Sequence, residues 1–413
     1  MLALKIAFRN LLRHKRRSIL CGLTLLFGYA LLSLSEATSA GTYSTLIEAF
    51  TREHTGHAQI HRQGYLDRPM MNKAISDPEK VSQVLEETPG VVAFAPRILG
   101  PALAYLNNKT TPVEIRGIDL TKEPLTTRVR EKLKQGRFPE NTPDKEGRYG
   151  VLLGASVAEN LKASLGDELV LISQGADGSV ANDLFIVTGT IGTPDSRDRV
   201  AVYMPLGAAR LFFTLPGQVH EFAVVFKSHK QSESGARQLE KRLAEAGGTL
   251  AGLTVEPWQV VEADFYRGMQ VDQKGNLITY FIILFIVAVG VLNVILMAIL
   301  ERTREFGVLK AMGTRPLDIF RLIVLETGLL ALLSTIAGLF VAIPVNLWFK
   351  VYGYKFPTPI EMGGISIDRM TAEVSVETLA GPALLVIIAA VLICLLPAFR
   401  AARIRVVDAL RST

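Results

Sequence analysis

The residue types that could perform chemistry are few and widely separated. His54, His57 and His61 lie close together, and strand alternation would place His57 and His61 on one face. No nearby acid or cysteine completes an obvious ligand set, so polar strand positions are favoured over a metal site. Cys21 and Cys394 lie far apart in apolar segments, which excludes a zinc ribbon and an external disulfide.

Motifs for nucleotide hydrolysis and acyl transfer are absent from the sequence. The dipeptide Gly-Lys does not occur, so a phosphate-binding loop of the G-x-x-x-x-G-K-[ST] type is excluded. A G-x-S-x-G nucleophile elbow does not occur either. We therefore expect no catalytic residue, no cofactor and no metal in this chain, and no ATPase activity of its own.

The most specific charged segment is Glu301–Thr327, ERTREFGVLKAMGTRPLDIFRLIVLET. A short helix is expected over Glu301–Met312, ended by Gly313, and Pro316 suits the first turn of the next helix. Its apolar stripe would be Phe306, Leu309 and Met312, and its charged residues facing elsewhere would be Arg302, Arg304, Glu305 and Lys310. Such a helix could press its apolar edge into a protein groove while its charges fix the orientation. The alternative is an ordinary surface hairpin.

Four apolar runs without Asp, Glu, Lys or Arg predict four membrane-spanning helices. The runs are Ser18–Ser35, Leu277–Leu300, Thr327–Phe349 and Thr378–Phe399. They place the spans at 18–40, 276–300, 317–349 and 378–399. Crossing a hydrocarbon layer takes about 20 helical residues, and one central charge costs roughly 3 kcal/mol, so the missing charges matter most. Buried soluble helices are the alternative for the last two runs.

Basic residues in the short flanking segments predict the orientation. They are Lys5, Arg9, Arg13, Lys15, Arg16 and Arg17 before the first span, Arg302, Arg304, Lys310, Arg315 and Arg321 between the second and third, and Arg400, Arg403, Arg405 and Arg411 after the fourth. By the positive-inside rule both termini, the 301–316 connector and the 400–413 tail are cytoplasmic. The segments 41–275 and 350–377 are then periplasmic. The basic pI therefore follows from topology and gives no support to nucleic-acid binding.

The first residues have two interpretations. Apolar Leu4, Ala7, Phe8, Leu11 and Leu12 recur at helical spacing, which predicts an amphipathic helix over 1–17 that lies on the inner membrane surface. A basic stretch followed by an apolar core and small residues is also typical of a cleaved signal peptide.

The insertion 41–275 is predicted to be an α+β domain with two β-α-β units at its ends. The expected strands and helices are His57–Arg62, Pro78–Glu87 and Val91–Pro96 in the first unit, and Glu221–Lys227, Ser232–Ala246 and Leu253–Trp258 in the second. They form a core of residues 41–98 and 219–258, with a mostly β subdomain inserted at 99–218. Residues 259–276 are expected to continue as one helix into the second span, although an ordinary tether would also fit.

These residues resemble the FtsX-like family of ABC transporter permeases, which includes the macrolide-exporter and lipoprotein-releasing (LolC/LolE-type) permeases. The resemblance is carried by ERTREFGVLKAMGT, by the tail LPAFRAARIRVVDALR, by GVLLGASVAENLKASLGDELVL and by the N-terminal KIAFRNLLRHKRRS. One departure is Ile404–Val407, where the family often has a proline.

The resemblance implies a permease that works with other subunits. Two permeases, identical or different, pair in the membrane, and an ATPase dimer that binds ATP and Mg²⁺ docks under the 301–316 connector, called the coupling helix. The implied ATPase-coupling residues are Glu301, Arg302, Arg304, Glu305, Phe306, Leu309, Lys310, Met312 and Gly313. Nucleotide-driven motion would then extract or export a lipoprotein, an amphiphile or a peptide, with a periplasmic carrier or adaptor as a further partner.

Two polar residues of the spans are additional candidates. Glu326 is expected near the cytoplasmic end, one turn after Arg321, as an interfacial ion-pair partner more than a proton relay. Asn293, with Gly290 and Gly338, is expected at helix-packing positions. The same mechanics could instead regulate a cell-wall hydrolase, and a membrane-anchored sensor module is a third possibility. The lack of a fused ATPase in this sequence favours the separate-subunit arrangement of the lipoprotein-releasing type.

Overall fold

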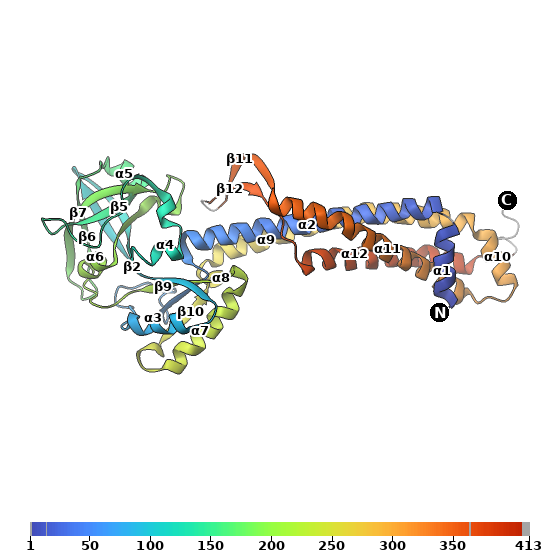
Figure 1. Ribbon diagram of the computed structural model, residues 1–413, viewed down its shortest axis with the longest axis horizontal. Helices are drawn as coiled ribbons and strands as arrows, with labels where there is room; N and C mark the ends of the chain where they lie inside the picture. Colours follow the sequence, from blue (N-terminus) through green and yellow to red (C-terminus); the bar gives the residue numbers. More distant parts are fainter. Residues whose placement is uncertain (1, 14, 363–364, 407–413) are drawn as a thin grey trace. The chain divides into compact units, whose positions relative to one another are not determined.

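The computed structural model describes residues 2–13, 15–362 and 365–406. It divides into two compact units, which we describe separately (Figure 1). The helical unit comprises Met1–Thr45, Met269–Ile360 and Asp368–Thr413, and the sheet unit comprises Leu46–Gly268 and Glu361–Ile367.

The helical unit contains four helices that are long and apolar enough to cross a membrane. They are α2 (Lys15–Phe50), α9 (Ala263–Glu301), α11 (Pro316–Val351) and α12 (Val376–Arg403). Two shorter helices, α1 (Leu2–Arg13) and α10 (Thr303–Ala311), belong to the same unit. The prediction of four apolar spans is confirmed, and α2 and α9 continue past the predicted spans into the sheet unit.

Small residues allow the helices of this unit to approach closely. A Cβ added at Gly290 would lie 2.8 Å from the side chain of Thr24, and one at Gly338 would lie 2.6 Å from the ring of Tyr29. Both glycines are therefore packing positions, as predicted.

Asn293 is exposed in this chain, so its packing role stays a prediction that concerns a helix of another chain. Val287, Val291 and Ile295 are buried and define the inner face of α9. Asn293 lies two residues from both Val291 and Ile295, and at about 100° per residue this places it on the opposite, exposed face.

Polar groups inside the helical unit are joined in a short chain. The Asn346 amide donates to Ser33 Oγ at 3.1 Å, and the Ser33 hydroxyl donates to the carbonyl of Thr378 at 3.2 Å. The Tyr29 hydroxyl donates to the carbonyl of Leu379 at 3.2 Å. These bonds tie α2, α11 and α12 together where hydrocarbon offers no other partner.

The ten strands of the sheet unit form one sheet in the described part of the chain. Its order is β10-β1-β9-β2-β3-β8-β5-β7-β4, and β6 pairs with β2 and β7. The strands are β1 (Ala58–Arg62), β2 (Val91–Leu106), β3 (Lys109–Ile118), β4 (Leu133–Gly136), β5 (Tyr149–Gly154), β6 (Glu168–Gln174), β7 (Val180–Ile191), β8 (Ala201–Pro205), β9 (Glu221–Phe226) and β10 (Leu253–Pro257). The helices are α3 (Pro78–Glu87), α4 (Glu123–Thr126), α5 (Ala155–Leu161), α6 (Leu206–Phe212), α7 (Ser232–Ala246) and α8 (Trp258–Val261).

The boundary between core and insert, predicted between residues 98 and 99, lies inside β2. The first part of this strand pairs with β9 and the second part pairs with β3. The strand is continuous from Val91 to Leu106, so one strand belongs to both regions. The helix expected over 259–276 is interrupted near Glu262 and then continues unbroken as α9 from Ala263.

The segment 350–377, predicted as a short loop, contains two strands. They are β11 (Tyr354–Met362) and β12 (Ile365–Met370), which pair as a two-stranded sheet. Nothing in the sequence analysis anticipated this hairpin.

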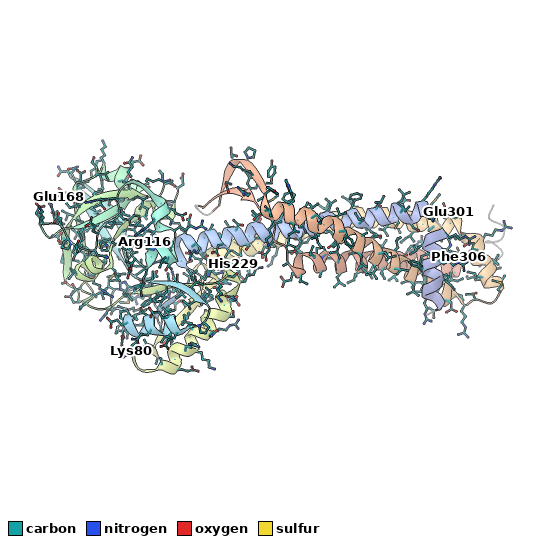
Figure 2. All side chains as sticks on the ribbon, in the orientation of Figure 1. Lys80, Arg116, Glu168, His229, Glu301 and Phe306 are labelled. Atoms are coloured by element: carbon teal, nitrogen blue, oxygen red, sulfur yellow. The ribbon has the colours of Figure 1, made fainter. Side chains whose placement is uncertain are left out.

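A buried ion-pair network stabilises the sheet unit around Arg97. Its guanidinium donates to Glu123 at 2.6 and 3.0 Å and to Glu221 at 3.1 Å. Burial by itself would raise the pKa of Glu221, but a hydrogen bond with His61 and the charge of Arg97 lower it to about 2. Figure 2 marks Arg116, a second buried guanidinium of this unit, which pairs with Asp198 at 2.9 Å.

Candidate functional site

The predicted coupling segment forms a helix and a sharp turn between α9 and α11. Helix α10 begins at Thr303, two residues later than expected, and ends at Ala311. Gly313 has φ of 94°, and Pro316 begins α11, so both predictions about the turn are confirmed. Figure 2 marks Glu301 and Phe306 in this part of the helical unit.

Arg302 is buried, although it was predicted to lie on an outward charged edge. Its Nη1 lies 2.9 Å from Glu326 Oε2, and its Nε lies 3.1 Å from Glu305 Oε2. The residue is 7% exposed, and its guanidinium lies 5.2 Å from the centre of the Phe306 ring. Arg302 precedes α10 and has non-helical backbone angles. The prediction assumed one helix that begins at Glu301, and for this reason it assigned the Arg302 side chain to the wrong direction.

Glu326 forms an ion pair with Arg302, the residue that caps α10. Glu326 is buried in the described chain, so its carboxylate requires a nearby cation. Arg302 supplies that cation across 24 positions of sequence. The ion pair therefore fixes the start of α10 against α11.

The predicted apolar stripe of α10 is divided between interior and surface. Phe306 is 2% exposed and belongs to the hydrophobic core of the helical unit, with Leu309 packed against that core. Met312 is 71% exposed. Phe306 and Leu309 therefore attach α10 to its own chain, and only Met312 of the three is available to a partner.

A different set of residues forms the exposed face of α10. Arg304 and Val308 lie four positions apart, and Met312 follows after four more, so they share one side of the helix. Arg315 and Leu317, just past the turn, are exposed as well. The spacing of four residues from Arg304 could have identified Val308 in the sequence, but Val308 was assigned to neither face and Met312 was assigned to the apolar stripe.

Two further contacts hold α10 against the rest of the helical unit. Glu305 Oε1 lies 3.7 Å from Arg13 Nη1 of α1, and Lys310 Nζ donates to the carbonyl of Ile404 at 2.7 Å. With Arg302 and Phe306, these contacts join α10 to α1, α11 and the segment after α12. Helix α10 is therefore attached to several elements of its own unit.

The two long helices are also fastened where they belong to the sheet unit. Phe50 of α2 stacks on Phe265 of α9, with ring centres 3.9 Å apart and planes 2° apart. The Arg197 guanidinium lies 4.7 Å from the Phe50 ring centre and forms two bonds with Glu262, at 2.6 and 3.0 Å. We call these four residues the aromatic clamp. Sequence reasoning missed it because its members are far apart in the chain.

The three histidines do not converge on one site. His57 Nε2 lies 3.1 Å from Glu48, and its Nδ1 accepts from the amide of Phe226. His61 lies 3.4 Å from Glu221. His54 lies in the single turn Thr51–Thr55, where its carbonyl accepts from Arg97. Each histidine thus has its own protein partner.

The order of the elements along the chain defines a class of protein. Four apolar helices form a membrane unit, an α/β sheet unit is inserted between the first and second of them, and a short anchored helix separates the second from the third. The protein is thus a multi-pass membrane protein with a large domain outside the bilayer.

Two family models match this chain, one over its first half and one over its last third. Residues 18–242 match the MacB-like periplasmic core domain, and residues 277–406 match the FtsX-like permease C-terminal region. The first match covers more than half of the chain. The chain therefore belongs to the FtsX-like family of ABC transporter permeases of the MacB and LolC type.

Individual relatives are distant. The lipoprotein-releasing system transmembrane protein LolC of Neisseria meningitidis is 20% identical over 288 residues, which is 68% of this chain and 66% of that protein. The macrolide export ATP-binding/permease protein MacB of Nitrobacter winogradskyi is 24% identical over 289 residues, 67% of this chain and 41% of that protein. The chain thus spans less than two thirds of either. The crystal structure of the periplasmic region of MacB from Actinobacillus actinomycetemcomitans covers 54% of this chain and 98% of its own, at 15% identity and a TM-score of 0.39.

Proposed function

We propose that this protein is the permease subunit of an ABC transporter and transmits motion from a partner ATPase to its sheet unit. The observation that carries the proposal is the form of α10, which is anchored on three sides and presents Arg304, Val308 and Met312 outward. An exposed apolar edge flanked by arginines suits a protein groove with acidic rims. ATP and Mg²⁺ belong to the partner.

The orientation of this arrangement follows from charge. Basic residues cluster in the segments next to α10, before α2 and after α12. The positive-inside rule puts all three on the cytoplasmic side, where ATP is available, with both termini there as well. The sheet unit and the 350–377 segment are then periplasmic.

Two continuous helices provide the path for transmission. Helix α9 has 39 residues and α2 has 36, which correspond to about 58 and 54 Å of rigid helix. Each runs from the helical unit into the sheet unit, where the aromatic clamp fastens both. Displacement at the α10 end is thereby carried outward without a mobile loop in the path.

The proposed cargo is a lipoprotein, an amphiphile or a peptide that the sheet unit moves outside the membrane. The names of the relatives above, a lipoprotein-releasing protein and a macrolide exporter, support this range. A second permease, identical or related, is a further proposed partner. Asn293 supports it, because a polar amide exposed on an apolar spanning helix is stabilised by a polar group on a neighbouring helix.

Charge and polarity reversals on the exposed face of α10 test the proposal. Purification from the native membrane in mild detergent is expected to bring down a nucleotide hydrolase, and Arg304→Glu or Met312→Glu to release it. Arg237→Glu is the matched control, because Arg237 is exposed on α7 of the sheet unit. A hydrolase that never co-purifies with the unaltered protein, or that both α10 variants retain, contradicts the proposal.

A further inference from the structure

A cavity of about 190 Å³ lies between α2, α9 and α12 of the helical unit. It is lined by Leu32, Glu36, Tyr280, Glu377, Gly381, Pro382 and Leu385. We propose that this cavity binds the ammonium group of an amphiphile, with the apolar tail continuing along α12. The binding claim concerns the permease alone, so it does not depend on the proposed ATPase coupling.

The charge of the lining selects a cation. Two carboxylates, Glu36 and Glu377, face the cavity, and the lining residues include no lysine, arginine or histidine. The Tyr280 hydroxyl donates to the Glu36 carboxylate, which fixes that group at the wall. Glu36 is half-buried and Glu377 is exposed beside the cavity. An ammonium group in the cavity would lie close to both negative charges and would be attracted by them.

The remaining walls select an organic cation over a metal ion. Leu32, Pro382 and Leu385 have apolar side chains, and Tyr280 adds an aromatic ring to the lining. Aromatic rings attract quaternary ammonium groups. Among the described residues, no three His, Cys, Asp or Glu side chains are arranged to hold a metal. The volume equals that of roughly six water molecules, enough for a trimethylammonium or ethanolamine head.

Exposed leucines on α12, next to the cavity, offer a surface for the apolar tail of the amphiphile. Leu384 and Leu385 are exposed on the helical unit, at 61% and 40%. A head group in the cavity would leave its chain against these leucines, where the surrounding hydrocarbon already favours it. The shared chemistry is thus an ammonium head with an apolar tail, which either a membrane lipid or a soluble cationic amphiphile can supply.

The test measures binding of radiolabelled dodecyltrimethylammonium to the purified full chain in an uncharged detergent. Glu36→Gln and Glu377→Gln are each expected to weaken binding at least tenfold. The glutamine at position 36 still accepts from Tyr280, so the wall keeps its shape. The control is Asp272→Asn, because Asp272 pairs with Tyr43 between the same two helices but does not line the cavity.

A second variant tests whether the cavity volume is needed for binding, without changing either carboxylate. A Cβ at Gly381 meets no atom within 4 Å, so Gly381→Leu adds its side chain to open volume and helix α12 is retained. It is expected to abolish binding while the elution volume and Tm stay unchanged. Dodecanoate, with the same chain and the opposite charge, is expected not to compete.

Mass spectrometry of the detergent-released protein distinguishes the two sources. An ethanolamine lipid retained by the unaltered protein and lost from Gly381→Leu identifies a membrane lipid, whereas added dodecyltrimethylammonium bound to lipid-free protein identifies a soluble amphiphile. Binding that is equal in the unaltered protein, Glu36→Gln, Glu377→Gln and Gly381→Leu overturns the proposal.

Discussion

The buried pair of Arg302 and Glu326 allows a quantitative test of how α10 is attached. The two side chains are 8% and 11% exposed and 2.9 Å apart. Removing one member of such a pair takes the nearest counter-charge away from the other buried group, and such changes cost about 3–5 kcal/mol. Arg302→Met should reach that range. Glu326→Leu should fall toward its lower end, because Arg302 keeps Glu305, which is 42% exposed.

The double variant separates the ion pair from simple loss of packing. Arg302→Met with Glu326→Leu replaces both charges with apolar groups of similar size, and such replacements are often neutral or stabilising. We therefore expect the free energy of unfolding to return to within about 1 kcal/mol of the unaltered value. The assay is equilibrium unfolding of the full chain in mixed micelles of neutral and denaturing detergent. Additive losses in the double variant would refute the argument that desolvated charge, and not shape, holds α10.

Two further predictions concern the sheet unit. The pKa of Glu221 is lowered from 4.5 to about 2 in the folded state by its hydrogen bond with His61 and by the charge of Arg97. These interactions stabilise the fold fully above pH 4.5, and their contribution, about 3 kcal/mol, is lost progressively as the pH falls from 4.5 toward 2. Urea unfolding followed from pH 7 to pH 3 should show this loss, and Glu221→Gln should flatten it; an equally steep profile in the variant excludes this carboxylate as the cause. Arg197→Lys keeps a positive charge but loses the two-pronged bond to Glu262 and the flat contact with Phe50. Amide hydrogen exchange at 46–55 and 262–268 should rise by about tenfold, and unchanged protection there would show that the clamp does not hold the helices.

The membrane-spanning helices could be predicted from the sequence because their signal is local. A run such as Thr378–Phe399 carries no charge, and the cost of burying a charge in hydrocarbon applies to each residue separately. The turn at Gly313 was predictable for the same reason, since a glycine after a helix needs no distant partner.

The burial of Arg302 could not be predicted because it depends on a distant partner. Arg302 is buried only because Glu326 lies beside it and because the helix axis breaks at this residue. Periodicity assumes one continuous axis, so the assumed phase of Arg302, Phe306 and Met312 was incorrect. The aromatic clamp is a similar case, because Phe50, Arg197 and Phe265 come from three separate segments.

The hydrogen bonds from Asn346 to Ser33 and from Ser33 to Thr378 restrict how the bundle can move. Sliding α2 past α11 and α12 by one helical turn, about 5.4 Å, would break both hydrogen bonds in a medium without water. The two bonds therefore oppose sliding of these helices, and we expect a force on one of them to move the bundle as a rigid body.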